Sequence, residues 1–313
     1  MCQLAYASNI EKLNLKQKQA LFSAIQSAMT KTNKSGYGLA SKKEDGTVEL
    51  ARTLDVSSPC HLKSSDVPIF CEPEHEGSID LKNAKEVIFH ARTSTNSVSI
   101  QNTHPFHIGS TILCHNGVLS YTGENYLKKT DNDTEDLTYH FNKYGLKRLS
   151  DNFSGYAAFI AFKDGLTHIV RDSQASLYYG YSEELDCHFF ATYTETLKTI
   201  QKALKIKFKC YKVLDDQHII IDLNKIVEVS PWSGLQYSSY ASSLSHLSLG
   251  RDISKPSIFK DDHDLKYYDS ILDDMESGDT EIRLNGLKIS YSEYLKLDNI
   301  SREAVEFIDK KTS

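Results

Sequence analysis

Short apolar segments separated by turn residues dominate the middle of this chain and restrict it to a fold rich in antiparallel sheet. Between residues 153 and 195 the sequence reads GYAAFIAFKDGLTHIVRD, SLYYGYS and HFFATYT, with Asp164-Gly165 as a turn. Such short runs bounded by turn signals are typical of β-strands. Helices are expected over residues 15–30, 134–145 and 195–204. Helices spaced among antiparallel strands predict an α+β fold of stacked sheets covered by helices.

The strand signals extend over most of the chain before residue 232. We expect further strands at residues 2–8, 36–41, 47–53, 86–93, 110–120 and 211–229, with Asp45-Gly46 as a hairpin turn. Residues 55–80 are rich in proline and serine and are predicted to form a long loop, and such loops often cover a functional site. These signals predict one domain over residues 1–232.

The composition changes beyond Trp232. Residues 233–250 are rich in serine and tyrosine, and residues 260–279 are acidic, which indicates a linker followed by a solvated helix. The last stretch, 281–311, is expected to add a small hairpin and a helix. We therefore predict a C-terminal extension over residues 233–313, without chemistry of its own.

Charge and motifs exclude several classes of function. The net charge of -6 and the isoelectric point near 6.1 argue against nucleic acid as the main partner, which would favour a strongly basic face. No apolar run is long enough to span a bilayer and the N-terminus lacks a signal pattern, so we expect a cytoplasmic protein without a membrane partner. The six cysteines are scattered without CxxC pairs, and HExxH, GxxxxGK[ST] and GxGxxG are absent, so no disulfide framework, metal or cofactor is expected.

Cys2 follows the initiator methionine directly. Removal of Met1 would leave Cys2 with a thiol and a free α-amine, and an α-amine has a pKa of about 7.7 to 8.0. The amine can take the thiol proton, so one residue combines a nucleophile and its base. This pairing suits amide hydrolysis, although many chains begin this way without any catalytic role.

Several sequence blocks occur in an order that resembles the class II glutamine amidotransferases, whose glutaminase domain is an N-terminal-nucleophile (Ntn) hydrolase. The blocks are MCQLAYAS, GYGLA, FHARTSTNSVSIQNTHPF, CHNGVL, DNDTEDL and FSGYAAFIAFKDGLTHIVRDSQASLYYG. The resemblance covers roughly residues 1–230 and is greatest for the compact, free-standing branch of the family. It implies a four-layer αββα sandwich with two stacked antiparallel sheets.

The resemblance also implies roles for individual residues. Cys2 would be the nucleophile, Asn116 and Gly117 would form the oxyanion hole, and Arg92 and Thr95 would bind the α-carboxylate of glutamine. Asp133 would bind the α-ammonium group. Each residue also has an ordinary structural interpretation: an arginine after a strand is usually a surface ion pair, Asn-Gly is a common turn, and Asp133 is a good N-cap for the following helix.

Four more residues are expected to support the site without touching substrate. Asn102 and His104, in the NTHPF block, are predicted to shape the turn behind the site. Arg171 and Asp172 match a family pair to which we assign a structural role.

The chain departs from the family pattern at four positions near the predicted site. Gln3 replaces the usual glycine after the nucleophile, and Thr93, Asn96 and Ser97 stand where the synthases carry Trp, His and Gly. These changes affect the expected geometry of the glutamine site and any Trp-gated coupling. They leave the nucleophile, the carboxylate anchor and the oxyanion pair in place.

These observations predict a glutaminase that converts glutamine to glutamate and ammonia through a Cys2 thioester. No synthase signature follows the domain, so the ammonia acceptor is expected to be a separate enzyme. Two alternatives stay open at this point: a hydrolase of other γ-glutamyl amides or peptides, and a non-catalytic scaffold subunit with the same fold.

Overall fold

The computed structural model describes residues 2–57, 75–94, 97–222 and 224–235, together with the backbone of three strands between residues 280 and 309. The chain divides into two compact units, Met1–Ser248 and Leu249–Ser313. Among the described residues, no helix combines the length and the apolar character needed to cross a membrane.

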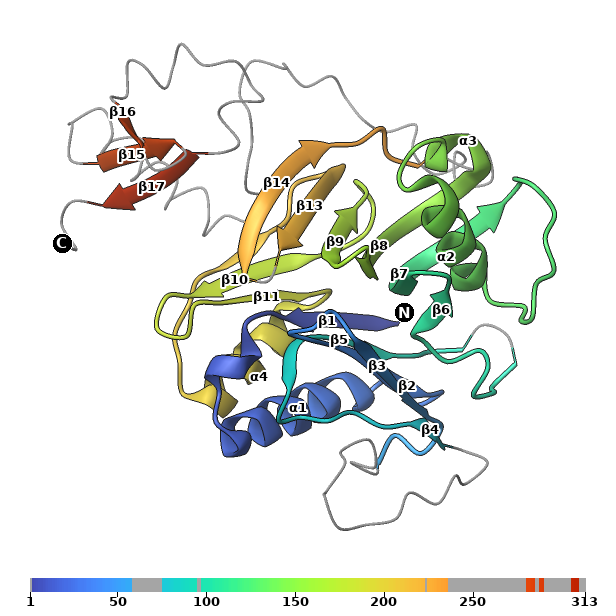
Figure 1. The fold of residues 1–313 in the computed structure, drawn as a ribbon, viewed down its shortest axis with the longest axis horizontal. Helices are drawn as coiled ribbons and strands as arrows, with labels where there is room; N and C mark the ends of the chain where they lie inside the picture. The colour runs from blue at the N-terminus through green and yellow to red at the C-terminus, as the bar shows by residue number, and fades with distance from the viewer. Residues whose placement is uncertain are drawn as a thin grey trace. The chain divides into compact units, whose positions relative to one another are not determined.

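Two antiparallel sheets form the first unit (Figure 1). The first sheet has the order β12 (Cys210–Lys212), β10 (Tyr178–Ser182), β11 (Cys187–Ala191), β1 (Gln3–Ala7), β5 (Ala84–Ala91), β2 (Tyr37–Lys43), β3 (Val48–Thr53) and β4 (His75–Gly77). The second sheet has the order β14 (Lys225–Pro231), β13 (Gln217–Asp222), β9 (Leu166–Arg171), β8 (Phe153–Lys163), β7 (Thr111–Tyr121) and β6 (Phe106–Ile108).

Helices cover the outer face of each sheet (Figure 1). They are α1 (Leu15–Thr30), α2 (Asp133–Tyr144), α3 (Leu149–Asn152) and α4 (Thr194–Leu204), with a 3-10 turn η1 (Ile10–Lys12) before α1. α1 and α4 pack on the first sheet, and α2 and α3 lie against the second. The predicted α+β sandwich of two stacked antiparallel sheets between helices is thus confirmed.

Three apolar cores follow from the alternation of side chains along the strands. Odd-numbered residues of β1, such as Ala5 and Ala7, pack beneath α1 and α4, whereas Leu4 and Tyr6 pack between the two sheets. A third core joins the outer face of the second sheet to α2 and α3. Because successive side chains on a strand point to opposite faces, odd and even positions of the same strand pack in different layers.

Local sequence signals account for most of the element boundaries. α1 begins at Leu15 because Asn14 and Gln17 form a capping box, in which each side chain bonds the other residue's backbone N–H over 2.9 to 3.0 Å. The β2–β3 hairpin turns at Asp45-Gly46 as predicted, and Asp164 and Gly165 adopt the positive φ angles that a tight β8–β9 turn requires.

The outlying segments are described only in part. Most of the predicted loop 55–80 lies outside the described residues, and its described end contains the short strand β4. In the second unit, β15 (Thr280–Leu284) and β16 (Leu287–Ile289) form a hairpin, and β17 (Val305–Asp309) pairs with β15. β17 is a strand in the stretch where the sequence indicates a helix. The rest of the predicted extension is outside the described residues.

A buried ion pair ties the two sheets together away from the predicted site. The Nζ atom of Lys42 on β2 lies 2.6 Å from Glu86 Oε1 on β5, and both side chains are almost completely buried. Lys42 also donates to the Gly165 carbonyl in the turn between β8 and β9 of the second sheet, and Tyr6 donates to Glu86 Oε2 over 2.6 Å. The pair is surrounded by hydrogen bonds, as a buried charge pair requires.

Replacing Lys42 by Met should destabilise the fold strongly. The variant leaves the Glu86 carboxylate buried without its counter-charge, a change that typically costs about 3 to 5 kcal/mol. Urea unfolding followed by circular dichroism measures the change. Lys43→Met is the matched control, because Lys43 pairs with Glu49 in a more exposed setting and its loss should cost much less. Equal midpoints for the two variants would contradict this interpretation.

Candidate active site

Strand alternation directs three of the predicted site residues toward the space between the sheets. The core in that space contains Leu4 of β1, Ile88 of β5 and Cys114 of β7. Asn116 lies two positions from Cys114 on β7, and Cys2 and Arg92, which directly precede β1 and follow β5, continue the alternation of Leu4 and Ile88. The fold therefore gathers the three residues at one end of the gap between the sheets.

The Cys2 thiol is held by one backbone segment. The Thr93 N–H donates to Cys2 Sγ over 3.4 Å, and the Thr93 carbonyl lies 3.6 Å from the same sulfur. Burial raises the pKa of the Cys2 thiol, while the Thr93 N–H and the Arg92 guanidinium lower it and the Asp133 carboxylate raises it further. Arg92 and Asp133 thus both lie within electrostatic range of the sulfur.

Arg92 is buried and only partly satisfied. Its side chain follows the end of β5, the residue is only 2% exposed, and Nη1 donates to the Ser97 carbonyl over 3.0 Å. Nη2 is buried and has no hydrogen-bond partner among the described residues. Burial lowers the Arg92 pKa, and the negative groups Cys2, Asp131 and Asp133 raise it. A buried donor without a partner is costly, so this guanidinium suits an external acceptor such as a carboxylate.

The edge of β7 leaves a backbone donor open at Gly117. Opposite Gly117, the N–H and carbonyl of Ala157 are both engaged by Asp172, over 2.8 and 3.0 Å. Gly117 and Ala157 are therefore a non-hydrogen-bonded pair, and the Gly117 N–H points away from β8. β6 pairs with β7 only as far as Leu113, and among the described residues no strand pairs with this side of Gly117.

Asn116 and Gly117 are both restricted by their surroundings. Asn116 is 5% exposed, and its Oδ1 atom has no hydrogen-bond partner among the described residues. At Gly117 a Cβ atom would lie 2.0 Å from the Tyr156 carbonyl oxygen, a distance that no side chain tolerates. The turn interpretation of Asn-Gly is wrong here, because both residues lie inside the long strand β7.

Asp133 lies at the start of α2, but it is not the N-cap. The cap is Asn132, whose side chain accepts from the Thr134 N–H over 2.9 Å. The prediction of an Asp133 cap is therefore wrong by one residue; asparagine and aspartate are equally good caps, so the pattern did not separate them. Asp133 instead accepts the Leu119 N–H of β7 at Oδ2, over 2.8 Å, with its side chain 30% exposed.

Three buried histidines lie behind these residues. The ring centroids of His90 and His104 are 3.7 Å apart, and the Thr134 hydroxyl bridges His104 Nε2 and His115 Nδ1. His90 Nε2 donates to the His115 carbonyl over 3.1 Å. Burial lowers the pKa of all three rings, that of His90 to about 3. The cluster is therefore neutral at neutral pH, and it fills the space between β5, β7 and α2.

The supporting residues behave as the sequence indicates. Asn102 donates to Asp131 and Ser97, and so links the turn before His104 to the segment that precedes α2. Arg171 is buried, and its guanidinium bonds the carbonyls of Ala175 and Val213 and the carboxylate of Asp215. Asn102 and Arg171 thus make structural contacts, and their predicted lack of contact with substrate stays a prediction.

The sequence did not indicate every residue around the site, and the structure does not test one predicted residue. Thr95, a predicted carboxylate ligand, lies outside the described residues. Thr134 and His115 were assigned no role, although His115 directly precedes Asn116 in the sequence. Within the described part of the chain, no group of three His, Cys, Asp or Glu side chains could hold a metal ion.

Comparison with known proteins gives a fold but no sequence relative. No family model and no curated protein matches the chain. The allosteric regulatory enzyme of purine biosynthesis superimposes with a TM-score of 0.53 at 16% identity. Glutamine phosphoribosylpyrophosphate (PRPP) amidotransferase from B. subtilis gives 0.51 at 17%. The chain has a glutamine amidotransferase fold.

Coverage is unequal in these comparisons. The match covers 74% of this chain in both cases, and this chain spans only 49% of each of the two enzymes. A predicted glutamine amidotransferase from Pseudomonas aeruginosa is more distant, with a TM-score of 0.41 at 13% identity, over 73% of this chain and 100% of its own. The likeness to the first two confirms the Ntn-hydrolase sandwich that the sequence resemblance implies.

The histidine cluster should make the fold acid-sensitive. The pKa of His90 is about 3 in the folded protein and about 6.5 in the unfolded chain, so the stability it confers is complete above pH 6.5 and is lost as the pH falls toward 3. Between pH 6 and 4, His90→Gln should lose less stability than the parent, by up to about 1.4 kcal/mol per pH unit.

Urea midpoints measured across that pH range test this prediction. His107→Gln is the control, because the His107 residue is exposed in the folded protein. If His90→Gln and the parent had parallel pH profiles, the buried neutral ring would not be the source of the acid sensitivity.

Proposed function

We propose that this protein is a glutamine-hydrolysing amidotransferase domain in which Cys2, freed by removal of Met1, is the nucleophile. The observation that carries the proposal is the buried Arg92 guanidinium, which has an unpaired Nη2 and lies within electrostatic range of a cysteine thiol and the Asp133 carboxylate. A free amino acid presents a carboxylate and an ammonium group, and this arrangement complements both charges.

Glutamine would bind with its two ends separated. Its α-carboxylate would accept from Arg92, with Thr95 as a second donor, and its α-ammonium group would meet Asp133. Asp133 Oδ2 is engaged by Leu119, and Oδ1 has no partner among the described residues. The carboxylate can therefore keep its structural bond and still accept from a ligand. The side-chain amide would then reach toward Cys2.

The reaction would proceed in two steps. The Cys2 α-amine takes the thiol proton, directly or through one water, and the sulfur attacks the amide carbon. The negative charge that develops on the oxygen meets the Asn116 side-chain amide and the open Gly117 N–H. The amine returns the proton to the nitrogen as ammonia leaves, and a γ-glutamyl thioester forms. Water then hydrolyses the thioester to glutamate and restores the thiol.

The ammonia released in this reaction would need an acceptor. The match covers 74% of this chain but only 49% of each of the two similar enzymes, so about half of each enzyme has no counterpart in the match. We propose that a separate enzyme accepts the ammonia. If the same residues hydrolysed other γ-glutamyl amides in preference to glutamine, the substrate assignment would change to those amides.

A glutamine-mimicking diazoketone should label Cys2 alone. The reagent needs both the carboxylate anchor and a reactive sulfur, so Arg92→Ala should reduce labelling at least about tenfold, as expected for the loss of a charge-assisted hydrogen bond. Peptide mapping by mass spectrometry measures the site, and intact mass reports whether Met1 is removed. The partly buried Cys210 is the internal control. Equal labelling of Cys210, or undiminished labelling in Arg92→Ala, would contradict the assignment.

Asn116→Ala should lower kcat for glutamine by about 100- to 1000-fold with a small change in KM, because an oxyanion donor acts in the transition state. Steady-state ammonia release with glutamine, and in parallel with a γ-glutamyl peptide, measures both parameters. Val118→Ala, at the exposed neighbouring position of β7, is the matched control and should stay within about twofold. If kcat/KM were higher for the peptide than for glutamine, the substrate would be a γ-glutamyl peptide and the glutamine assignment would be wrong.

A further inference from the structure

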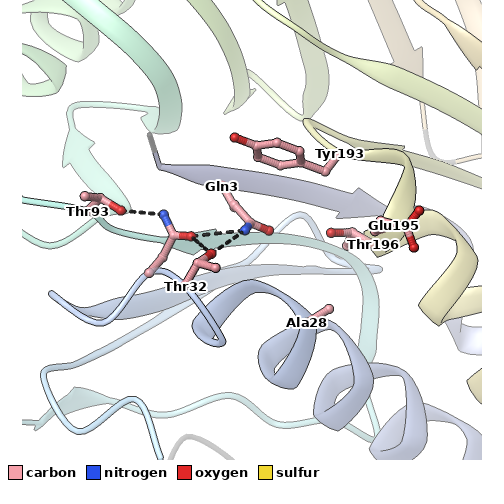
Figure 2. A pocket seen from close by; sticks show the side chains of 8 residues that line it. Gln3, Ala28, Thr32, Thr93, Tyr193, Glu195 and Thr196 are labelled. Carbon is pink, nitrogen blue, oxygen red and sulfur yellow. Dashed lines mark hydrogen bonds between the residues drawn. The ribbon is translucent and has the colours of Figure 1, made fainter.

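Gln3 faces the opposite side of β1 from Cys2. Ala5 and Ala7 share its face and lie in the core beneath α1 and α4, so the Gln3 side chain extends toward those helices. There it lines a cavity of about 500 Å³ between the end of α1, the start of α4 and the start of β1 (Figure 2). The family glycine at this position has no side chain to place there.

A chain of hydrogen bonds runs from Gln3 across this cavity wall (Figure 2). Gln3 Nε2 donates to Thr32 Oγ1 over 3.1 Å and to Asn33 Oδ1 over 3.0 Å, and Thr32 Oγ1 also donates to Asn33 Oδ1 over 2.7 Å. Asn33 Nδ2 then donates to Thr93 Oγ1 over 2.7 Å. Because Asn33 Oδ1 accepts two donors, its amide is oriented with Nδ2 toward Thr93.

The last member of this chain is the residue that touches the nucleophile. The Thr93 backbone N–H donates to Cys2 Sγ, and this bond opposes the rise in the Cys2 pKa that burial causes. Asn33 is 1% exposed, so its amide is held by protein groups and not by bulk water. Neighbouring backbone bonds join Ser35 to Arg92 and Gly36 to Arg92, which keeps the same segment in register with the start of β2.

We infer that Gln3 and Asn33 are positioning residues for the Cys2 thiol, acting through the Thr93 side chain to hold the Thr93 N–H against the sulfur. Thr32 completes the set by orienting Asn33. The inference rests on the proposed function in taking Cys2 as the nucleophile, but the contact itself is independent of turnover. The glutamine at position 3 thus has a specific role, since a glycine there would have no side chain to donate to Asn33 Oδ1.

The test measures the reactivity of the thiol and needs no glutaminase activity. The full chain is alkylated with iodoacetamide from pH 6 to 10, and the Cys2 peptide is quantified by mass spectrometry, since the thiolate is the reacting form. Thr93→Val removes the hydroxyl that Asn33 bonds, and Thr93→Ser retains it. Asn33→Ala and Gln3→Ala remove earlier members, and Glu195→Gln, at another part of the cavity wall, is the control.

We expect Thr93→Val and Asn33→Ala to slow Cys2 alkylation about three- to tenfold at pH 7 and to move the midpoint of the rate–pH profile upward, as for the loss of one hydrogen bond. Gln3→Ala should give a smaller change in the same direction. Thr93→Ser and Glu195→Gln should stay within about twofold. The N-terminal ammonium group, Arg92 and Asp133, which are the charged groups acting on the thiol, are unchanged in every variant.

An unshifted midpoint in Thr93→Val would overturn the inference, and because Thr93 is exposed this variant is expected to fold even if Asn33→Ala does not. A shifted midpoint in a protein without glutaminase activity would support the network and reject the proposed function. Normal glutaminase activity together with unshifted midpoints would support the proposed function and reject the positioning role of the network. The two proposals can therefore fail separately.

Discussion

The bond from the Leu119 N–H to Asp133 Oδ2 joins the first turn of α2 to the uncovered edge of β7. The neighbouring Thr134 hydroxyl reaches His115 on the same strand, so two successive helix residues contact β7. α2 places acidic side chains at its N-terminus, where the helix dipole favours negative charge. The location of the Asp133 carboxylate at the edge of β7 thus depends on how one helix packs against one strand.

Two buried polar atoms at the candidate site lack hydrogen-bond partners among the described residues, whereas the buried ion pair of the first sheet is enclosed. The Lys42–Glu86 pair is buried and enclosed by hydrogen bonds, as expected for a structural feature. Arg92 Nη2 and Asn116 Oδ1 are buried without partners among the described residues. Burying such a group costs free energy unless something supplies its partner, which makes an external ligand the natural complement of these atoms.

Much of the fold was predictable because its signals are local. The helix over residues 15–30 and the turns at Asp45-Gly46 and Asp164-Gly165 appear where the sequence indicates them, since capping, periodicity and turn chemistry act within a few residues. The error at the α2 cap has the same origin: Asn132 and Asp133 are both competent caps, and only the Leu119 N–H, distant in sequence, engages Asp133 in another role.

The sequence by itself determined the layered fold and the types of residue available for chemistry, because turn, capping and strand signals act within a few residues. Only the tertiary structure decided which backbone groups remain free and how the thiol is held. The Gly117 N–H points away from β8, because the Ala157 N–H opposite it bonds Asp172 instead. The Thr93 side chain accepts a hydrogen bond from Asn33. Such contacts depend on partners far apart in the chain, and no periodicity encodes them.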